Sequence, residues 1–304
     1  MDAPMKSIES SLIEEVCYKL LTHASIELPP EVEKAIREAY QKESNPAGQS
    51  YLKAMLDNIQ IARERKVPLC QDTGIPMYYI TLGSEIHIQG SLREAINQAT
   101  CRATQDVPLR PQVSHPLTRE ISKTNVGWGI PPIFLDYKDG QDEMEIIGVP
   151  RGGGAEAKWQ CVHPYAGVDR KKAVMKIAMD AMSMAGGECC PPVIMGIGVG
   201  GYGRDYTELM ARKVMYRTPL NSRHPDSEVA EMEERIYQAI NKMGIGPLGI
   251  GGNTTCLAVH MDIAGGHTAG ASVAVSLYCW SARYSKAKIM SSGRVEYMTH
   301  PNIK

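Results

Sequence analysis

The stretch "VPLCQDTGIPMYY", residues 67–79, is where the pattern of this sequence changes. Before it, apolar residues recur at the spacing of amphipathic helices, and after it short strand-like runs alternate with helical ones. Four reactive side chains also stand together in it, namely Cys70, Gln71, Asp72 and Thr73. A tight turn, in which Asp72 and Thr73 cap the following element, would explain the polar residues. The alternative is a site that needs a thiol, an amide and a carboxylate close together.

Three helices are predicted upstream of this stretch. The segment "SIESSLIEEVCYKLLTH" (7–23) places apolar side chains near a 3.6-residue period. The segment "LPPEVEKAIREAYQKE" (28–43) carries proline at its start, and "SYLKAMLDNIQIARER" (50–65) follows it. We therefore expect a helical N-terminal segment over residues 1–66, packed on the same domain as the rest of the chain.

Downstream, residues 67–304 are expected to form an α/β module. The predicted strands are 77–83, 132–137, 143–149, 191–201, 256–263, 271–280 and 294–298, and the predicted helices are 91–106, 168–187, 204–215 and 226–244. No repeat and no linker interrupts this series. The fold class is therefore predicted as α/β, or mixed α+β, with a helical N-terminal layer.

Composition narrows the class of protein. The net charge is −1, from 33 Lys and Arg against 34 Asp and Glu, which argues against a nucleic acid or an anionic membrane as the main partner. No apolar run approaches the roughly 18 residues that a membrane-spanning helix needs. The N-terminus shows no secretory signal, and eight cysteines are scattered over 304 residues. We expect a protein of the reducing cytoplasm, without a disulfide framework.

The cysteines do not form a local metal-binding motif. No C-x-x-C pair occurs, so a metal site would have to gather single cysteines from distant loops. Cys189 and Cys190 are adjacent in "GGECCPPVIMG", and Cys279 follows a predicted strand, where α/β proteins place ligands. Small buried hydrophobic side chains are the alternative for each of them.

Two glycine-rich segments have competing interpretations. The loop "VPRGGGAEAKW" (149–159) exposes backbone N–H groups that can hold a carboxylate or phosphate, or it is a bulge. Gly196, Gly198 and Gly201 match the G-x-G-x-x-G fingerprint of a dinucleotide-binding oxidoreductase. That fingerprint requires a strand ending in an acid about 20 residues later. Here Pro219 interrupts this region, so glycines that pack a strand against a helix are the other interpretation.

Two single residues complete the candidates. Arg110 stands between prolines in "VPLRPQ", which suits a guanidinium fixed to grip a carboxylate, although a surface arginine is the default. His267 lies in the glycine loop "DIAGGHTAGAS", twelve residues before Cys279, and is a catalytic candidate or a solvated loop histidine.

Taken in order, these segments resemble one family. CQDTG (70–74), PLRP (108–111), GGG (152–154), C-P-P (190–192), the loop around His267 and C-W (279–280) are similar to the α chain of class I hydro-lyases. This family includes the oxygen-sensitive class I fumarases and L-tartrate dehydratase, and the resemblance spans roughly residues 50 to 290.

The resemblance implies a 4Fe-4S cluster held by three cysteines. Carried over by motif, the cluster ligands are Cys70, Cys190 and Cys279, the catalytic residues are Asp72 and His267, and the substrate-binding residues are Gln71, Arg110 and Gly153. Cys189 is the competing ligand beside Cys190. The implied reaction is the reversible hydration of a four-carbon dicarboxylate, with fumarate and water giving malate expected first and L-tartrate or mesaconate as alternatives.

The sequence departs from the family's fumarases near the implied substrate pocket. After PLRP those enzymes have a stretch like "NAVDPVTGKNTGNN", and this chain has "QVSHPLTREISKTNVGWG" (112–129). Ala155-Glu156-Ala157 also replaces Ser-Glu-Asn, so the identity of the dicarboxylate stays open. One-chain members carry a further domain, which we expect to belong to a separate chain here. We therefore expect a β subunit that supplies the remaining catalytic residues, in an α2β2 assembly.

Overall fold

The computed structural model describes residues 6–165, 167–300 and 303, which fold as two compact units. Unit 1 consists of Met1–Pro30, Asn58–Gly152 and Arg283–Lys304, and unit 2 consists of Glu31–Asp57 and Gly153–Ala282. Both units draw on residues before and after position 66. The predicted division of the chain at residue 66, into a helical segment and an α/β module, stays a prediction.

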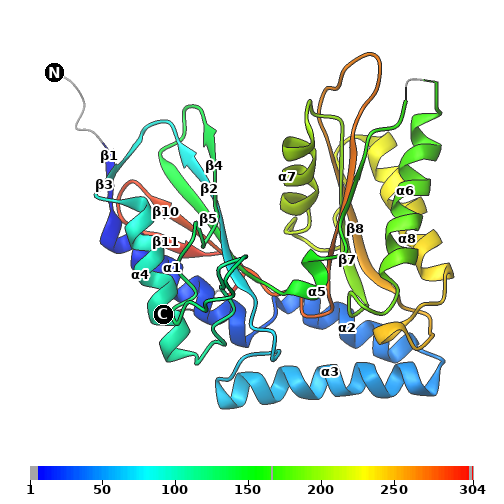
Figure 1. Cartoon of the computed structure of the whole chain (residues 1–304), viewed down its shortest axis with the longest axis horizontal. Coiled ribbons are helices and arrows are strands. Elements are labelled where there is room, and N and C mark those ends of the chain that lie inside the picture. Colours follow the sequence, from blue (N-terminus) through cyan, green and yellow to red (C-terminus); the bar gives the residue numbers. More distant parts are fainter. Residues whose placement is uncertain (1–5, 166, 301–302, 304) are drawn as a thin grey trace. The chain divides into compact units, whose positions relative to one another are not determined.

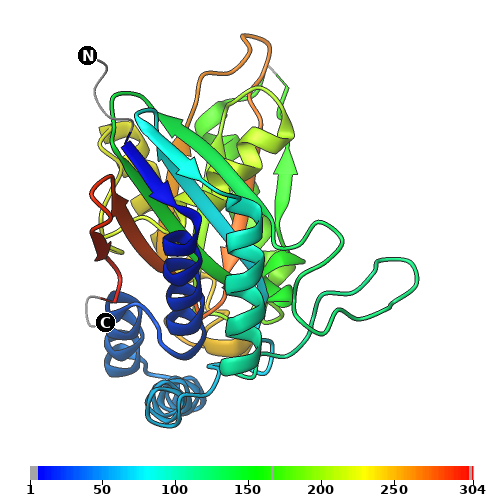
Figure 2. The ribbon, with the colours of Figure 1, turned by 90° about the vertical axis from the view of Figure 1, so that its left-hand side faces the viewer.

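Unit 1 is built on a five-stranded sheet in the order β11-β10-β5-β2-β4 (Figure 1). Its strands are β1 (Lys6–Glu9), β2 (Ile75–Gly83), β3 (Ile86–Gln89), β4 (Ile133–Lys138), β5 (Glu143–Arg151), β10 (Ser285–Met290) and β11 (Val295–Tyr297), and its helices are α1 (Ser10–Ile26) and α4 (Leu92–Asp106). The helices α1 and α4 pack beside each other over one face of the sheet (Figure 2). Their apolar faces and the inward side chains of β2 and β5 form the core of unit 1.

Unit 2 is built on a four-stranded sheet in the order β6-β9-β7-β8. Its elements are α2 (Pro30–Lys42) from Glu31 onward, the first part of α3 (Pro46–Arg65), α5 (Gly153–Glu156), β6 (Gln160–Val162), α6 (Arg170–Ala185), β7 (Val193–Val199), α7 (Arg204–Val214), α8 (Ser227–Lys242), the 3-10 turn η1 (Pro247–Gly249), β8 (Cys256–Ile263) and β9 (Val273–Tyr278). Figure 1 shows α6 and α8 on one face of this sheet and α7 on the other. The α/β fold class predicted from the sequence is confirmed.

The different packing on the two faces of β7 explains why the strand contains glycines. Met195 and Ile197 point into the core under α6 and α8. On the other face, a Cβ added at Gly196 would lie 2.0 Å from the carbonyl oxygen of Ala211, and one at Gly198 would lie 2.2 Å from that of Thr207. Helix α7 therefore rests directly on the backbone of β7. This is the packing function that the sequence offered as the alternative to a dinucleotide fingerprint.

Gly198→Ala is expected to destabilise unit 2, because the added methyl group must push α7 away from the sheet. Overpacking of this kind costs about 3 kcal/mol. Gly265→Ala is the matched control, since nothing lies within 4 Å of the Cβ added there. Urea unfolding followed by circular dichroism measures both. Equal stability of the two variants would contradict the close packing of α7.

Buried His260 on β8 links stability to pH. Its ring nitrogens lie 3.1 and 2.8 Å from the carbonyl oxygens of Val214 and Leu220. Burial, assisted by the Arg217 guanidinium, lowers the pKa of His260 from 6.5 to about 4, outweighing the carbonyl acceptors and Glu233, which raise it. The folded protein thus keeps the ring neutral where the unfolded chain would protonate it. This contribution to stability is complete above pH 6.5 and is lost as the pH falls toward 4.

We therefore expect the unfolding free energy of the wild-type chain to fall more steeply than that of His260→Gln between pH 7 and pH 4. The difference between the two chains should change by on the order of 3 kcal/mol over that range. Urea titrations at pH 7, 5.5 and 4 measure it. If the unfolding free energies of the two chains changed in parallel with pH, His260 would titrate alike in the folded and unfolded states.

Several predicted elements differ in extent from the observed ones. The helix expected over 7–23 begins at Ser10, because residues 6–9 form β1 and pair in parallel with β3. Strand β10 has no predicted counterpart, since Lys286 and Lys288 interrupt its apolar pattern. Lys288 reaches Glu143 on the neighbouring strand β5, with 2.6 Å between Nζ and Oε1. Among the helices of the described residues, none combines the length and apolar composition needed to cross a bilayer.

Candidate active site

The CQDTG loop precedes β2 in unit 1 and is held at both ends. At its start, the Leu69 N–H donates to the carbonyl of Ser25 at 2.9 Å, and the Leu69 carbonyl accepts from the Asn58 amide at 2.8 Å. At its end, Gly74 has φ +83°, and a Cβ there would lie 2.6 Å from the carbonyl carbon of Pro150. Only glycine fits this position. The side chains between the two ends therefore have defined places.

Asp72 is held by hydrogen bonds to both its side chain and its backbone. Its Oδ1 accepts from the Gly74 N–H at 3.1 Å and from the Gln112 side-chain amide at 2.8 Å. Its backbone carbonyl accepts a hydrogen bond from the buried Arg283 guanidinium. A Cβ added at Gly152 would lie 3.1 Å from Asp72 Oδ2, so the absence of a side chain there leaves room for the carboxylate.

Arg110 lies against the same loop, although it is 37 residues from Thr73. The Arg110 N–H donates to the Thr73 hydroxyl at 3.1 Å, and that hydroxyl lies 3.3 Å from the Arg110 carbonyl. Buried Asn125 donates to the same carbonyl at 3.2 Å. The Arg110 backbone is thereby fixed, while its side chain is exposed. This fits the expected arginine that grips a carboxylate.

Cys70 and Gln71 complete this part of the site. Cys70 is half-buried, Gln71 is exposed, and the Cys70 sulfur lies 3.7 Å from Gln71 Oε1. Unit 1 therefore brings four of the predicted residues together, namely Cys70, Gln71, Asp72 and Arg110.

Unit 2 brings Cys190 and Cys279 together at one end of its sheet. Cys190 comes shortly before β7, and Cys279 directly follows β9. These two strands are antiparallel neighbours, with Ile194 opposite Tyr278. The Trp280 N–H also donates to the Cys190 carbonyl at 3.0 Å. Two predicted cluster ligands that are 89 positions apart in the sequence thus lie on adjacent backbones.

The vicinal cysteines differ in accessibility. Cys189 is completely buried, and its thiol lies 3.5 Å from the Gly186 carbonyl. Burial raises the pKa of the Cys189 thiol to about 12. Cys190 is exposed and has a φ of +52°, so its side chain leaves the backbone in another direction. This difference in exposure favours Cys190 over Cys189 as a ligand.

The glycine-rich loop lies at the same end of unit 2. Gly153 begins the short helix α5, and a Cβ added at Gly154 would lie 3.3 Å from the carbonyl oxygen of Glu188. Lys158 forms an ion pair with the Glu188 carboxylate. The loop therefore lies beside the segment that leads into Cys190. Its backbone N–H groups are the kind of donors that bind a substrate carboxylate.

The donor chemistry of these residues suits an iron–sulfur cluster. Cys70, Cys190 and Cys279 are at least partly accessible, whereas Cys17, Cys189 and Cys256 are buried. Thiolates are the ligands that hold such clusters. In the described residues no three His, Cys, Asp or Glu side chains form a metal-binding group. Cys70 belongs to unit 1, and Cys190 and Cys279 belong to unit 2.

His267 lies elsewhere in unit 2. It stands in the loop between β8 and β9, which leads into the first residue of β9, while Cys279 follows the last (Figure 1). A strand of six residues spans roughly 20 Å, so His267 and the two cysteines occupy opposite ends of the sheet. His267 is exposed, and its Nδ1 accepts from the Ala269 N–H at 3.0 Å, which places the ring proton on Nε2.

Two exposed tyrosines lie near the His267 loop. Tyr165 is 87% exposed and Tyr202 is 83% exposed, and the Tyr202 ring centroid lies 6.2 Å from that of His267. Tyr165 pairs with Gly270 in the same loop. We call Tyr165, Tyr202 and the His267 loop the tyrosine patch. Exposed aromatic groups gathered in this way are typical of protein contacts.

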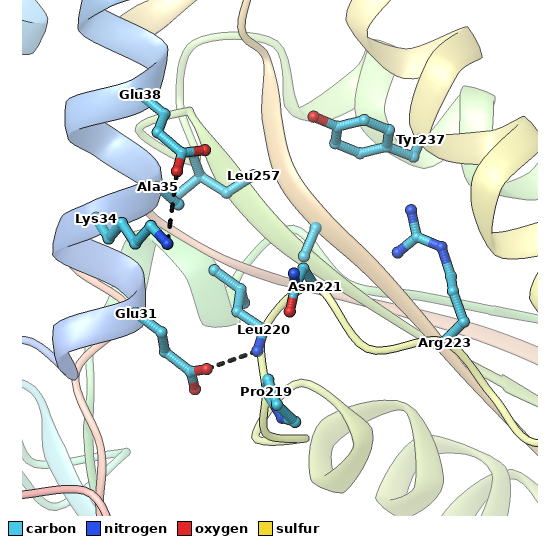
Figure 3. A pocket seen from close by; sticks show the side chains of 11 residues that line it. Glu31, Lys34, Ala35, Glu38, Pro219, Leu220, Asn221, Arg223, Tyr237 and Leu257 are labelled. Atoms are coloured by element: carbon cyan, nitrogen blue, oxygen red, sulfur yellow. Dashed lines mark hydrogen bonds and ion pairs between the residues drawn. The ribbon is translucent and has the colours of Figure 1, made fainter.

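A separate pocket of about 380 Å³ lies in unit 2 between α2, α8 and β8 (Figure 3). Glu31 accepts there from the Leu220 N–H at 2.6 Å, and Lys34 lies 3.9 Å from Glu38. Arg223 and Tyr237 line its other side. None of the predicted site residues lines this pocket.

Sequence reasoning did not identify three residues that support the CQDTG loop, namely Gln112, Asn125 and Arg283. Gln112 stands directly after PLRP, so its place next to a predicted site residue was the available signal. Asn125 and Arg283 carry no local signal, because only the fold brings Asn125 to the Arg110 carbonyl and Arg283 to the Asp72 carbonyl.

Comparison with known proteins agrees with the motifs. Residues 14–288 match the family described as fumarate hydratase (Fumerase). The chain is 39% identical over 282 residues to a putative L(+)-tartrate dehydratase subunit alpha of Methanocaldococcus jannaschii, covering 91% of this chain and 97% of that protein. It is 29% identical over 288 residues to the L(+)-tartrate dehydratase subunit alpha of Escherichia coli K12, covering 94% of this chain and 93% of that protein. The predicted resemblance is confirmed, and the chain belongs to the fumarate hydratase (Fumerase) family of hydro-lyases.

Proposed function

We propose that this chain is the α subunit of an iron–sulfur hydro-lyase that converts L-tartrate to oxaloacetate. The observation that carries the proposal is that Cys190 and Cys279 lie on adjacent backbones, joined by the hydrogen bond from the Trp280 N–H to the Cys190 carbonyl, beside the glycine loop. The sequence placed fumarate and malate first. The names of two relatives, at 39% and 29% identity, favour tartrate instead. Hydration of fumarate is the second candidate, because the family model is that of fumarate hydratase.

Cys70, Cys190 and Cys279 are proposed as the ligands of a 4Fe-4S cluster. When bound, such a cluster with three thiolate ligands supplies an iron with an open position, which acts as a Lewis acid on the substrate hydroxyl. The ligand set rests on accessible thiols in family motifs. It predicts that iron content depends on these three residues and not on the buried cysteines.

The remaining residues have roles that follow from their chemistry. Dehydration breaks a C–H bond on one carbon and the C–O bond on its neighbour, and the enol formed becomes the keto acid. Arg110 and the backbone N–H groups at Gly153 would hold the two carboxylates, and this also makes the C–H proton easier to remove. Gln71 would orient the substrate. Asp72 would hold or deliver the proton that leaves with the hydroxyl group.

A β subunit is part of the proposal. The relatives named above are alpha subunits, and the base that removes the C–H proton is expected on the partner. An α2β2 assembly in the cytoplasm is the expected form. All eight cysteines are free thiols, which suits a reducing compartment.

The predicted catalytic role of His267 is proposed to involve a second copy of the chain. At roughly 20 Å from Cys190 and Cys279 within unit 2, it cannot act on a cluster held by the cysteines of its own chain. We propose that the tyrosine patch docks on a second αβ pair and that His267 enters the site of that copy. A shared site would explain why a histidine with an Nε2 proton stands among exposed aromatic side chains.

The test is co-expression with the β subunit and anaerobic reconstitution with iron and sulfide. About four irons per chain and a brown colour are expected. Oxaloacetate formed from L-tartrate, and malate formed from fumarate, are then measured separately. Faster turnover of L-tartrate supports the proposal, and faster turnover of fumarate replaces it by the second candidate. An iron-loaded complex inactive on both would overturn the dicarboxylate assignment.

A further inference from the structure

Gln112 belongs to a long loop, but its side chain contacts the CQDTG loop. It lies in the segment between α4 and β4, which forms no regular helix or strand over residues 107–132 and extends away from the sheet of unit 1 (Figure 2). Its side-chain amide nevertheless reaches the CQDTG loop, 40 positions earlier in the sequence, where it donates to Asp72 Oδ1 at 2.8 Å. The same nitrogen lies 3.3 Å from the Thr73 hydroxyl.

The backbone of Gln112 is itself fixed. Its N–H donates at 2.8 Å to the side-chain oxygen of Asn125, which is completely buried. The Asn125 amide donates in turn to the Arg110 carbonyl and lies 3.3 Å from the Thr104 hydroxyl on α4. Gln112 is thus anchored by buried groups on one side and donates to a carboxylate on the other. A side chain held in this way loses little entropy when it orients its neighbour.

We propose that Gln112 is a positioning residue for Asp72. This inference rests on the proposed function, in which Asp72 acts on the substrate. A carboxylate can rotate about its last torsion angle, and the Gly74 N–H donates to Oδ1 of Asp72 at 3.1 Å. A second donor on the same oxygen fixes that rotation, and it directs Oδ2 toward Gly152, where no side chain intervenes.

Loss of the Gln112 amide is expected to lower turnover rather than substrate binding. A misplacement of about 1 Å in a reacting group can cost on the order of 100-fold in rate. Gln112 itself contacts Asp72 and Thr73, and the proposed carboxylate-binding groups, Arg110 and Gly153, are unaffected. The expected pattern is therefore a lower kcat with little change in KM.

The test uses Gln112→Met, which keeps the length of the side chain and removes its donors, in the reconstituted complex with the β subunit. We expect kcat to fall by about 10- to 100-fold and KM to change by less than about threefold. Iron content and thermal unfolding should match the wild type. Gln60→Met is the matched control, because Gln60 also donates to a carboxylate at 2.8 Å, that of Glu64, but on an exposed helix surface.

A double-mutant cycle separates positioning from a general structural effect. In an Asp72→Asn background, Gln112→Met should cost less than about twofold, because the group that it positions has already been changed. An equal loss in both backgrounds, or a wild-type kcat for Gln112→Met, would overturn the inference. A wild-type complex without hydro-lyase activity would instead contradict the proposed function.

Discussion

Cys190→Ser is expected to lose most of its iron and all hydro-lyase activity, while Cys189→Ser keeps both. The two positions are neighbours in the sequence, but Cys189 is completely buried and Cys190 is exposed. Serine is a poor replacement for a thiolate ligand, whereas in a buried packing position it changes little in size. Cys70→Ser and Cys279→Ser should behave like Cys190→Ser. Anaerobic iron analysis after reconstitution gives a measurement that does not depend on the substrate.

Cys256→Ser is the control for this series, because its buried thiol lies 3.0 Å from the Ala258 carbonyl within β8. Its iron content should equal that of the wild type. Loss of the cluster in Cys189→Ser with retention in Cys190→Ser would reverse the assignment within the pair. If Cys256→Ser lost the cluster and Cys279→Ser did not, the transfer of ligands by motif would be wrong.

Mixing two inactive chains is expected to restore activity if His267 acts in the site of a second copy. His267→Asn and Cys279→Ser should each abolish turnover alone. When the two are co-expressed with the β subunit, half of the α pairs are mixed, and each mixed pair has one site with both residues intact. In a symmetric dimer about a quarter of the wild-type activity should return. Asparagine can still accept the Ala269 N–H, so the loop itself is preserved.

His224→Asn is the matched control for that experiment. Its Nδ1 also accepts an N–H two residues later, from Asp226 at 3.0 Å, and it is not a predicted site residue. This variant should keep full activity. A mixture that stays as inactive as its parents would show that no site is shared between copies. Full activity of His267→Asn alone would remove the histidine from the proposed mechanism.

Local patterns in the sequence predicted many of the elements and the family. Apolar periodicity predicted most helices, and the strand predicted over "CLAVHMDI" has the observed bounds of β8. The ordered motifs CQDTG, PLRP and C-P-P predicted the family. These signals are local, since each depends on residues within about one element, and a local pattern can be read without knowing the fold.

Which residues contact one another depends on the folded arrangement of the elements. The glycines of β7 match a dinucleotide fingerprint in the sequence, and their packing function appears only because α7 lies against them. Gln112 reaches Asp72 across 40 positions, and His267, twelve positions from Cys279, lies a full strand length away from it. A β-strand carries the chain some 3.4 Å per residue, so short separations in sequence become long ones in space. Long separations are closed by sheet pairing and buried hydrogen bonds, which no single segment encodes.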